Sequence, residues 1–213
     1  MIKLVPRTKQ SPITSAIIPI LAVALTMFFG GILFWMLGKD PFETIRMIFW
    51  DPLMNETFAD YARPQILVKA APLILIAIGL SFGFRANIWN IGAEGQFIIG
   101  AIFSGALGLA VYPQESFLLF PFMIVFGIIG GVFWASIPAL LRTYFNTNEI
   151  LTSLMLVYIG LLVLSYLIYG PWKAPDSYNF PESRLFHDAA LVPLITEDTR
   201  LHIGCLIALA FAL

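Results

Sequence analysis

The chain has 213 residues, of which 59% are apolar or aromatic (Ala, Val, Ile, Leu, Met, Phe, Trp, Tyr, Cys) and only 12% are charged. Soluble domains contain about 25% charged residues, so this composition excludes an ordinary soluble domain. The net charge of -1 provides no basic surface for nucleic acid, and one cysteine with two histidines excludes a disulfide framework and a Cys- or His-based metal site. The remaining class is a polytopic helical membrane protein.

The first apolar run covers residues 15–38 and contains no charged residue. An α-helix of that length is about 36 Å long, enough to cross the ~30 Å hydrocarbon core of a bilayer. Lys3, Arg7 and Lys9 precede the run, as in a secretory signal peptide. A signal peptide has an apolar region of only about 7–15 residues, however, and no small-residue cleavage site follows Gly38. We therefore predict a retained anchor with a cytoplasmic N-terminus.

Residues 39–65 then form a mixed-charge stretch on the outer side of the membrane. Its portion FETIRMIF has helix-like apolar spacing, and we expect it to lie along the membrane surface. A second outer stretch, residues 171–202, is rich in Pro, Asp and Ser and reads as a loop with at most a short helix at residues 185–191.

Further apolar runs occupy residues 67–84, 97–112, 117–141 and 150–170, and a sixth begins at Ile203 and reaches only Leu213. A transmembrane helix needs about 20 residues, so the sixth run is incomplete. We predict an all-α integral membrane bundle, a single transmembrane domain over residues 1–213, that forms the N-terminal part of a longer protein. Inner segments 1–14, 85–96 and 142–149 hold Lys3, Arg7, Lys9, Arg85 and Arg142, which agrees with the predicted orientation but gives only a weak bias.

The segment between the second and third runs is unusual because both apolar arms are short and flank the polar sequence RANIWNIGAEGQ, residues 85–96. Short segments interrupted by glycine or proline often mark a translocation site, whether the pair crosses the membrane or re-enters it. We therefore expect the solute path to be lined by Asn87, Trp89, Asn90, Glu94 and Gln96, with Arg85 as a partner for Glu94. The alternative is an ordinary cytoplasmic turn in which Glu94 and Arg85 are solvated.

Small residues recur every fourth position after this segment, at Gly100, Ser104 and Gly108 and again at Gly127, Gly131 and Ala135. Such spacing lets two helices approach closely, so these faces are predicted to be packing seams.

Between the fourth and fifth spans, PALLRTYFNTNE (residues 138–149) indicates a short amphipathic helix followed by an Asn/Thr cap for the next helix. Its apolar residues Leu140, Leu141, Tyr144 and Phe145 lie beside Arg142, which is unusual for a loop that faces water. We expect this turn to dock on a cytoplasmic partner; the alternative is a plain capped turn.

Two stretches carry a family resemblance. GFRANIWNIGAEGQFIIGA (residues 83–101) and PALLRTYFNTNEILTSLMLVYIG (residues 138–160) resemble the inner-membrane permease subunits of ABC importers, in the branch that handles nucleosides and simple sugars. The NIGAEGQ string is the more specific part. Members of this family continue through several further helices.

The resemblance implies a multi-pass protein of a bacterial or archaeal plasma membrane. It would pair with a second permease subunit, identical or different, receive solute from an extracytoplasmic solute-binding lipoprotein, and be driven by two ATP-binding cassette subunits. Residues 139–149 would then be the coupling helix on the ATPase, and residues 87–96 would lie near the solute path. The resemblance assigns the coupling role to Leu140, Leu141, Arg142, Phe145, Asn148 and Glu149.

The chain contains no GxxxxGK[ST] phosphate-binding motif, so we expect it not to be an enzyme and to need no cofactor or metal. A nucleoside is the favoured solute and a simple sugar the runner-up. An ion-coupled secondary transporter, with Glu94 as the ion site, is the second class. An intramembrane hydrolase is disfavoured because no Ser/His or carboxylate pair falls at one membrane depth.

Overall fold

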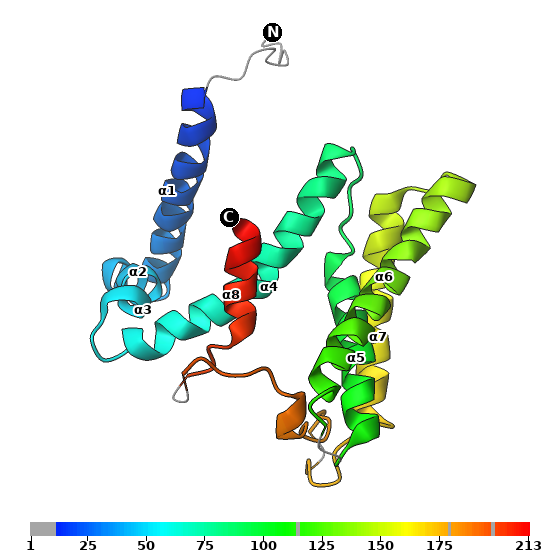
Figure 1. Cartoon of the computed structure of the whole chain (residues 1–213). Helices are drawn as coiled ribbons and strands as arrows, with labels where there is room; N and C mark the ends of the chain where they lie inside the picture. The colour runs from blue at the N-terminus through cyan, green and yellow to red at the C-terminus, as the bar shows by residue number, and fades with distance from the viewer. Residues whose placement is uncertain (1–11, 114–115, 179, 197–198) are drawn as a thin grey trace. The chain divides into compact units, whose positions relative to one another are not determined.

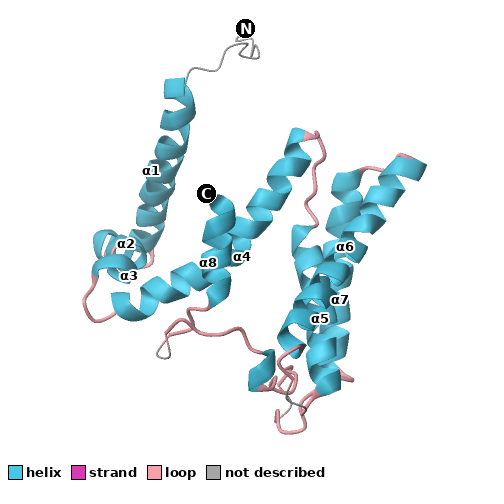
Figure 2. Cartoon of the chain, in the orientation of Figure 1, coloured by secondary structure: helices cyan, strands magenta, loops and turns pink. Residues whose placement is uncertain are grey.

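The computed structural model describes residues 12–113, 116–178, 180–196 and 199–213, and it is helical over most of that length (Figures 1 and 2). Lys3, Arg7 and Lys9, which carry part of the orientation argument, lie outside the described residues. The chain divides into two compact units, one up to Ile66 and one from Leu67. The prediction of a single transmembrane domain stays a prediction.

The first unit contains α1 (Pro12–Met36), α2 (Pro41–Phe49), α3 (Asp51–Met54) and the beginning of α4 (Ala59–Arg85). Asp40 caps α2, because its carboxylate accepts hydrogen bonds from the backbone N–H groups of Phe42 (2.8 Å) and Glu43 (3.1 Å). The helix expected in FETIRMIF is therefore confirmed. It packs against α1 where Gly31 leaves room for Pro41.

A hydrogen bond joins α3 to α4 within this unit. The guanidinium of Arg63 donates from Nε to the carbonyl oxygen of Leu53 at 2.8 Å, and its Nη2 donates to the same oxygen. This pairing satisfies a carbonyl in the last turn of α3, which has no partner within so short a helix.

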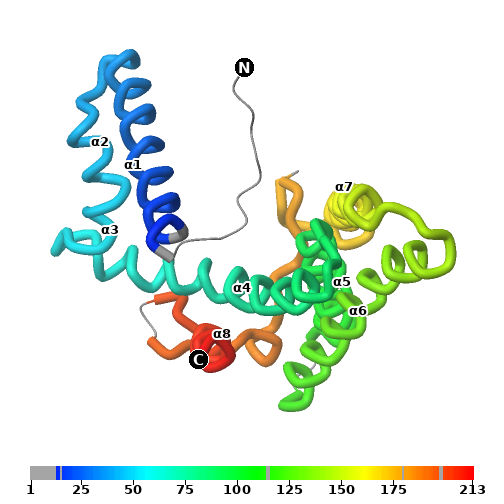
Figure 3. The backbone as a smooth tube through the Cα atoms, turned by 90° about the horizontal axis from the view of Figure 1, so that it is seen from above, coloured from blue at the N-terminus to red at the C-terminus, as the bar shows by residue number. Residues whose placement is uncertain are grey.

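The second unit contains the rest of α4, α5 (Ala93–Val111), α6 (Leu119–Phe145), α7 (Glu149–Tyr169), the 3₁₀ turn η1 (Asp188–Ala190) and α8 (Ile203–Ala212). Helix α5 packs against both α6 and α7, and the three lie side by side in Figures 1 and 3. Helix α8 packs on α4, where Ala71, Cys205 and Ala208 form a buried cluster.

The small-residue seams predicted from the sequence are confirmed at the contact between α5 and α6. A Cβ atom added to Gly100 would lie 2.9 Å from the carbonyl oxygen of Gly127, and one added to Gly127 would lie 3.5 Å from Cβ of Ser104. A Cβ atom added to Gly130, on the adjacent face of α6, would lie 2.7 Å from Cγ of Phe103 on α5. Only glycine allows backbones to approach this closely.

Five helices are long and apolar enough to cross a membrane: α1 from Ala16, α4, α5, α6 and α7. They correspond to the five complete apolar runs. Only 6% of the apolar windows of α1 and α4 is buried within the chain, against 39% of that of α5. Helix α5 is thus the centre of its bundle, whereas α1 and α4 leave most of their apolar surface for lipid or other protein.

Four elements differ in their bounds from the sequence predictions. Helices α4 and α5 have 27 and 19 residues, so both are longer than the predicted arms. Helix α6 continues through Pro138 to Phe145, so residues 139–145 are its last two turns and not a separate helix. The helix expected at residues 185–191 is the single turn η1.

The loop that follows α7 is anchored on the end of the α5–α6 pair. The ring of Phe186 fills the notch at Gly105 and Gly108, and Phe186 packs with a cluster that includes Met123 and Ala190. Ser177 of this loop is buried and donates its hydroxyl hydrogen to the carbonyl oxygen of Ala174 at 2.9 Å. The loop is therefore packed against the bundle and is not a free tether.

Candidate functional site

The polar segment between α4 and α5 is an ordered break held by its own hydrogen bonds. Asn87 adopts a left-handed conformation with φ of 57°, and the N–H of Ile88 donates to the carbonyl oxygen of Gly83 at 2.9 Å. The side-chain oxygen of Asn90 accepts from the N–H of Gly92 at 2.9 Å. These are local turn interactions, and they fix the backbone without a regular helix.

The break is also attached to α7. The N–H of Ile91 donates to Oγ of Ser153 at 3.3 Å, and Ser153 is only 2% exposed. A Cβ atom on Gly92 would lie 2.9 Å from both Cβ and the carbonyl oxygen of Ser153, and one on Gly95 would lie 3.0 Å from Cα of Val157. The glycines of the NIGAEGQ string therefore let the break and α5 sit directly on the backbone of α7.

The turn between α6 and α7 is tightly built as well. Asn146 ends α6 in a left-handed conformation with φ of 51°, and its N–H donates to the carbonyl oxygen of Arg142 at 3.0 Å. The side chain of Asn148 caps α7 by accepting from the N–H groups of Ile150 (2.9 Å) and Leu151 (3.3 Å). The guanidinium of Arg142 forms an ion pair with the carboxylate of Glu149, across the turn.

This ion pair is partly protected from water, because the side chain of Arg142 is 38% exposed and that of Glu149 is 19% exposed. Glu149 also lies in the first turn of α7, where the positive end of the helix dipole favours a carboxylate. The pair ties the last turn of α6 to the first turn of α7.

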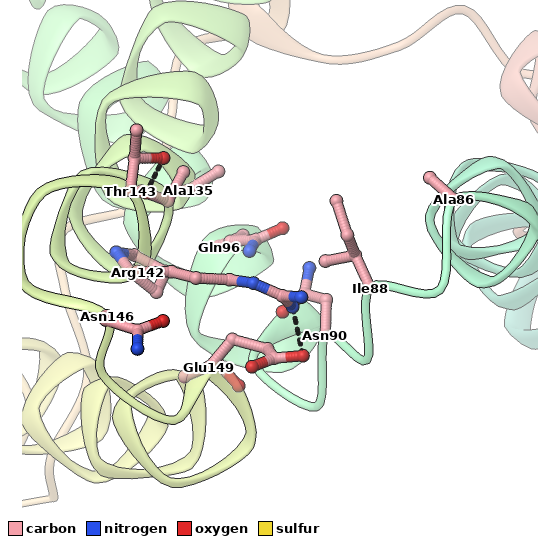
Figure 4. Close-up of a pocket in the computed structure, with 12 residues that line it drawn as sticks. Ala86, Ile88, Asn90, Gln96, Ala135, Arg142, Thr143, Asn146 and Glu149 are labelled. Carbon is pink, nitrogen blue, oxygen red and sulfur yellow. Dashed lines mark hydrogen bonds and ion pairs between the residues drawn. The ribbon is translucent and has the colours of Figure 1, made fainter.

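The break and the turn enclose one cavity of about 450 Å³ (Figure 4). Side chains from the break, α5, α6 and α7 reach it. The lining residues are Ala86, Ile88, Asn90, Gln96, Ala135, Pro138, Ala139, Arg142, Thr143, Asn146, Glu149 and Ser153. We call this space the turn cavity. A second cavity, of about 430 Å³, lies between α4 and α5 and shares Ile88, Asn90 and Gln96 with the turn cavity.

The residues predicted for the solute path separate into two groups. Asn90 and Gln96 line both cavities, so the structure places these two together. Asn87, Trp89 and Glu94 are exposed and line neither of them. The ring of Trp89 instead packs on that of Phe84, with centroids 5.2 Å apart.

The expected ion pair of Glu94 with Arg85 is not formed. Within the part of the chain that the structure describes, the side-chain ion pairs are Arg46 with Asp51 and Arg142 with Glu149. Glu94 is exposed and lies in the first turn of α5, where the positive end of the helix dipole stabilises a carboxylate. No partner from α4 is needed to hold it there.

The residues predicted for coupling also separate into groups, which differ in exposure and in whether they line the turn cavity. Leu140, Tyr144 and Phe145 are exposed, with Phe145 at 74%, whereas Leu141 is half-buried. Arg142 and Glu149 face the turn cavity, and Asn148 is occupied as the cap of α7. The apolar surface at this end of α6 is therefore formed mainly by Leu140, Tyr144 and Phe145.

Sequence reasoning missed Ser153 and Asn146 as members of the site. Ser153 lies five residues after the capping Asn148, and the adjacent polar pair Thr152 and Ser153 within an apolar helix is the signal that could have found it. The sequence indicated that Asn146 lies in a turn. It gave no sign that this side chain would line a cavity together with Gln96, which lies 50 residues earlier in the chain.

Residues 63–213 match the protein family described as "Branched-chain amino acid transport system / permease component". The glucose ABC transporter permease protein TsgB13 of Haloferax volcanii is 35% identical over 175 residues, 82% of this chain and 44% of that protein. The guanosine ABC transporter permease protein NupP of Bacillus subtilis is 24% identical over 200 residues, 92% of this chain and 55% of that protein.

The nucleoside ABC transporter permease protein NupB of Lactococcus lactis subsp. cremoris is 24% identical over 200 residues, 91% of this chain and 54% of that protein. The chain thus spans about half the length of these curated relatives. No solved structure matches it.

Proposed function

The chain belongs to this family of transport-system permease components, and on that premise we propose that it is a membrane-spanning subunit of an ATP-driven importer. Its helices would form part of the solute path, and ATP would be hydrolysed by separate cytoplasmic subunits. The favoured solute is a nucleoside, with a simple sugar as the alternative. Relatives whose names state guanosine, nucleoside and glucose support both solutes.

The observation that carries the proposal is the turn cavity. A polar break in the membrane-spanning helices and an exposed apolar helix end meet at one cavity through Asn90, Gln96, Arg142 and Glu149. A permease that is driven by a separate cytoplasmic ATPase subunit requires such a connection between its solute path and the surface on which the ATPase docks. An ordinary capped turn does not require it.

We place the solute path along Asn90 and Gln96, with Asn87, Trp89 and Glu94 on the exposed side of the same polar stretch. Amide side chains both donate and accept hydrogen bonds, which suits the hydroxyls of a sugar and the edges of a base. The coupling surface comprises Leu140, Leu141, Arg142, Phe145, Asn148 and Glu149.

The proposed assembly has two permease subunits, two ATP-binding cassette subunits and a solute-binding lipoprotein outside the cell. The proposed membrane is the plasma membrane of a bacterium or archaeon, with the N-terminus in the cytoplasm. The loop that follows α7 would then face outward, and the turns at residues 86–92 and 146–148 would face the cytoplasm.

An ion-coupled secondary transporter is less well supported, because Glu94 is exposed and does not line the turn cavity or the cavity between α4 and α5. The decisive experiment expresses the permease with its neighbouring genes and measures labelled guanosine and glucose uptake. ATP-dependent uptake that persists without an ion gradient, together with copurification of an ATPase subunit, supports the importer. Uptake that follows the ion gradient without any ATPase subunit would contradict it.

A further inference from the structure

The turn cavity contains amide groups that the protein itself does not use. In the described structure, the side chains of Gln96 and Asn146 take part in no hydrogen bond, and Asn90 uses only its side-chain oxygen. All three line the cavity (Figure 4). A partly enclosed cavity with free donors and acceptors from three segments is the composition of a binding site for a polar molecule.

The charges of the lining indicate which kind of molecule fits. The charged groups in it are Arg142 and Glu149, and they are paired with each other, so their formal charges cancel. A charged ligand would lose its hydration without gaining an unpaired counter-charge, which is costly. An uncharged ligand that bears hydroxyl or amide groups loses less and can satisfy the free amides. The volume of about 450 Å³ lies in the range typical of small-molecule sites.

The turn cavity is lined by three segments that would move relative to one another during transport. Asn90 belongs to the break, Gln96 to α5, and Asn146 to the turn that follows the coupling surface on α6. A ligand bound to all three favours the arrangement in which they surround it. By thermodynamic linkage, any movement of the coupling surface that opens this arrangement is opposed when the ligand is present.

We propose that the turn cavity is an inhibitory site for uncharged polar solute on the cytoplasmic side, built from the amides of Asn90, Gln96 and Asn146. Imported solute that accumulates inside the cell binds there and slows ATP hydrolysis by holding the α6–α7 turn. This inference rests on the proposed function, because it requires an importer whose motor docks at that turn.

The test uses the intact transporter complex in nanodiscs, where both faces are accessible, without the solute-binding protein. Direct binding and ATPase activity are measured with guanosine and with D-glucose as separate probes, and guanosine 5′-monophosphate serves as the charged control. We expect one uncharged probe to bind at up to millimolar concentration and to lower the ATPase rate over the same concentration range. The charged nucleotide should bind at least about tenfold more weakly.

Two variants locate the site. Gln96→Leu removes one amide at similar size, and Asn146→Gly removes the other while keeping the left-handed backbone that glycine adopts readily. Each should weaken probe binding about fivefold, the loss expected for one or two hydrogen bonds. The matched control is Gln65→Leu on α4, which lines neither cavity and should bind the probe as the unmodified protein does.

Failure of the inference and failure of the proposed function give different results. Normal ATP-driven uptake with no binding of either probe, or with binding unchanged in both site variants, overturns the inhibitory site alone. Binding that leaves the ATPase rate unchanged overturns it as well. A permease that neither copurifies with an ATPase subunit nor supports ATP-dependent uptake overturns the proposed function, and the inference with it.

Discussion

The backbone N–H of Ile91 donates a hydrogen bond to Oγ of Ser153, with the two atoms 3.3 Å apart. The hydroxyl of Ser153 in turn donates to the carbonyl oxygen of Ile150 at 3.2 Å. This chain of two bonds joins the break before α5 to the first turns of α7. Because α7 begins at Glu149, which belongs to the proposed coupling surface, a displacement of that surface would be carried to the break by these part-buried hydrogen bonds.

The first prediction concerns this contact. Ser153→Ala leaves the N–H of Ile91 without its acceptor in a partly buried position beside the buried Ser153, which costs about 1 kcal/mol of unfolding free energy. For a chain of this size that lowers the melting temperature in detergent by several degrees. Ser165→Ala is the control on the same helix, because its hydroxyl bonds only to the carbonyl oxygen of Leu161 at an exposed position. Equal melting temperatures for the two variants would contradict the role of Ser153.

Hydrogen exchange at a single amide gives a second readout of the same contact. The Ile91 amide should exchange measurably faster in Ser153→Ala and should be unchanged in Ser165→Ala, because only the first variant removes its acceptor. A general loosening of the fold would instead accelerate exchange along all of α7.

The second prediction concerns the close approach at Gly92. Gly92→Ala puts a methyl group within 2.9 Å of Ser153, and the break must move away from α7 to make room. Overpacking of this kind typically costs about 1–3 kcal/mol, so the variant should be less abundant in the membrane and should melt earlier. Gly30→Ala is the control, since among the described residues nothing beyond its chain neighbours and its own helix backbone lies within 4 Å of the added methyl group. A Gly92→Ala protein as stable as the control would show that the break is not tightly seated.

The sequence predicted the fold well where one-dimensional patterns carry it. Uninterrupted apolar runs located the five long helices. Small residues at every fourth position, in one series that begins at Gly100 and another that begins at Gly127, located the α5–α6 seam. These features depend on hydrophobicity and side-chain size, which are local properties of the chain.

The site was harder to predict because it depends on contacts between distant segments. Polarity selected Asn90 and Gln96 correctly, but it selected Asn87, Trp89 and Glu94 as well, and only the three-dimensional arrangement separates the two groups. The end of α6 illustrates a different limit. The sequence indicated a short separate helix within residues 138–149, but α6 continues to Phe145 with Pro138 buried inside it. Proline disfavours a helix interior, and tertiary packing overrides that preference here.

The third prediction concerns the coupling surface. Phe145→Asp places a charge on an apolar side chain that is 74% exposed and that we assign to the ATPase contact. An aromatic side chain at the centre of an interface can contribute about 2 kcal/mol or more to binding. The affinity for the ATPase subunit should therefore fall about 30-fold or more, and less of that subunit should copurify. Because Phe145 is exposed within this chain, the variant should still insert and fold.

Phe117→Asp is the matched control for this variant. Phe117 is 94% exposed but lies just before α6, at the opposite end of that helix from Phe145. Its substitution should leave ATPase association intact. If both variants lose the ATPase subunit equally, the effect is one of folding or insertion and the assignment of Phe145 is wrong.

The last prediction tests orientation by labelling single cysteines in intact cells. Cys205 is buried, and Cys205→Ser provides a background without other thiols. Ser177 is a poor probe of the outer loop because it is packed inside it, whereas Leu185 is 87% exposed. In this background Leu185→Cys should react with a membrane-impermeant maleimide added outside the cell, and Phe145→Cys should react only after the membrane is permeabilised. Both sites lie beyond the ends of the apolar helices or at their last turn, so neither result depends on access through lipid. The reverse pattern would place the α6–α7 turn outside the cell, where no ATP-hydrolysing subunit could reach it, and would therefore exclude both the proposed coupling surface and an inhibitory site for internal solute.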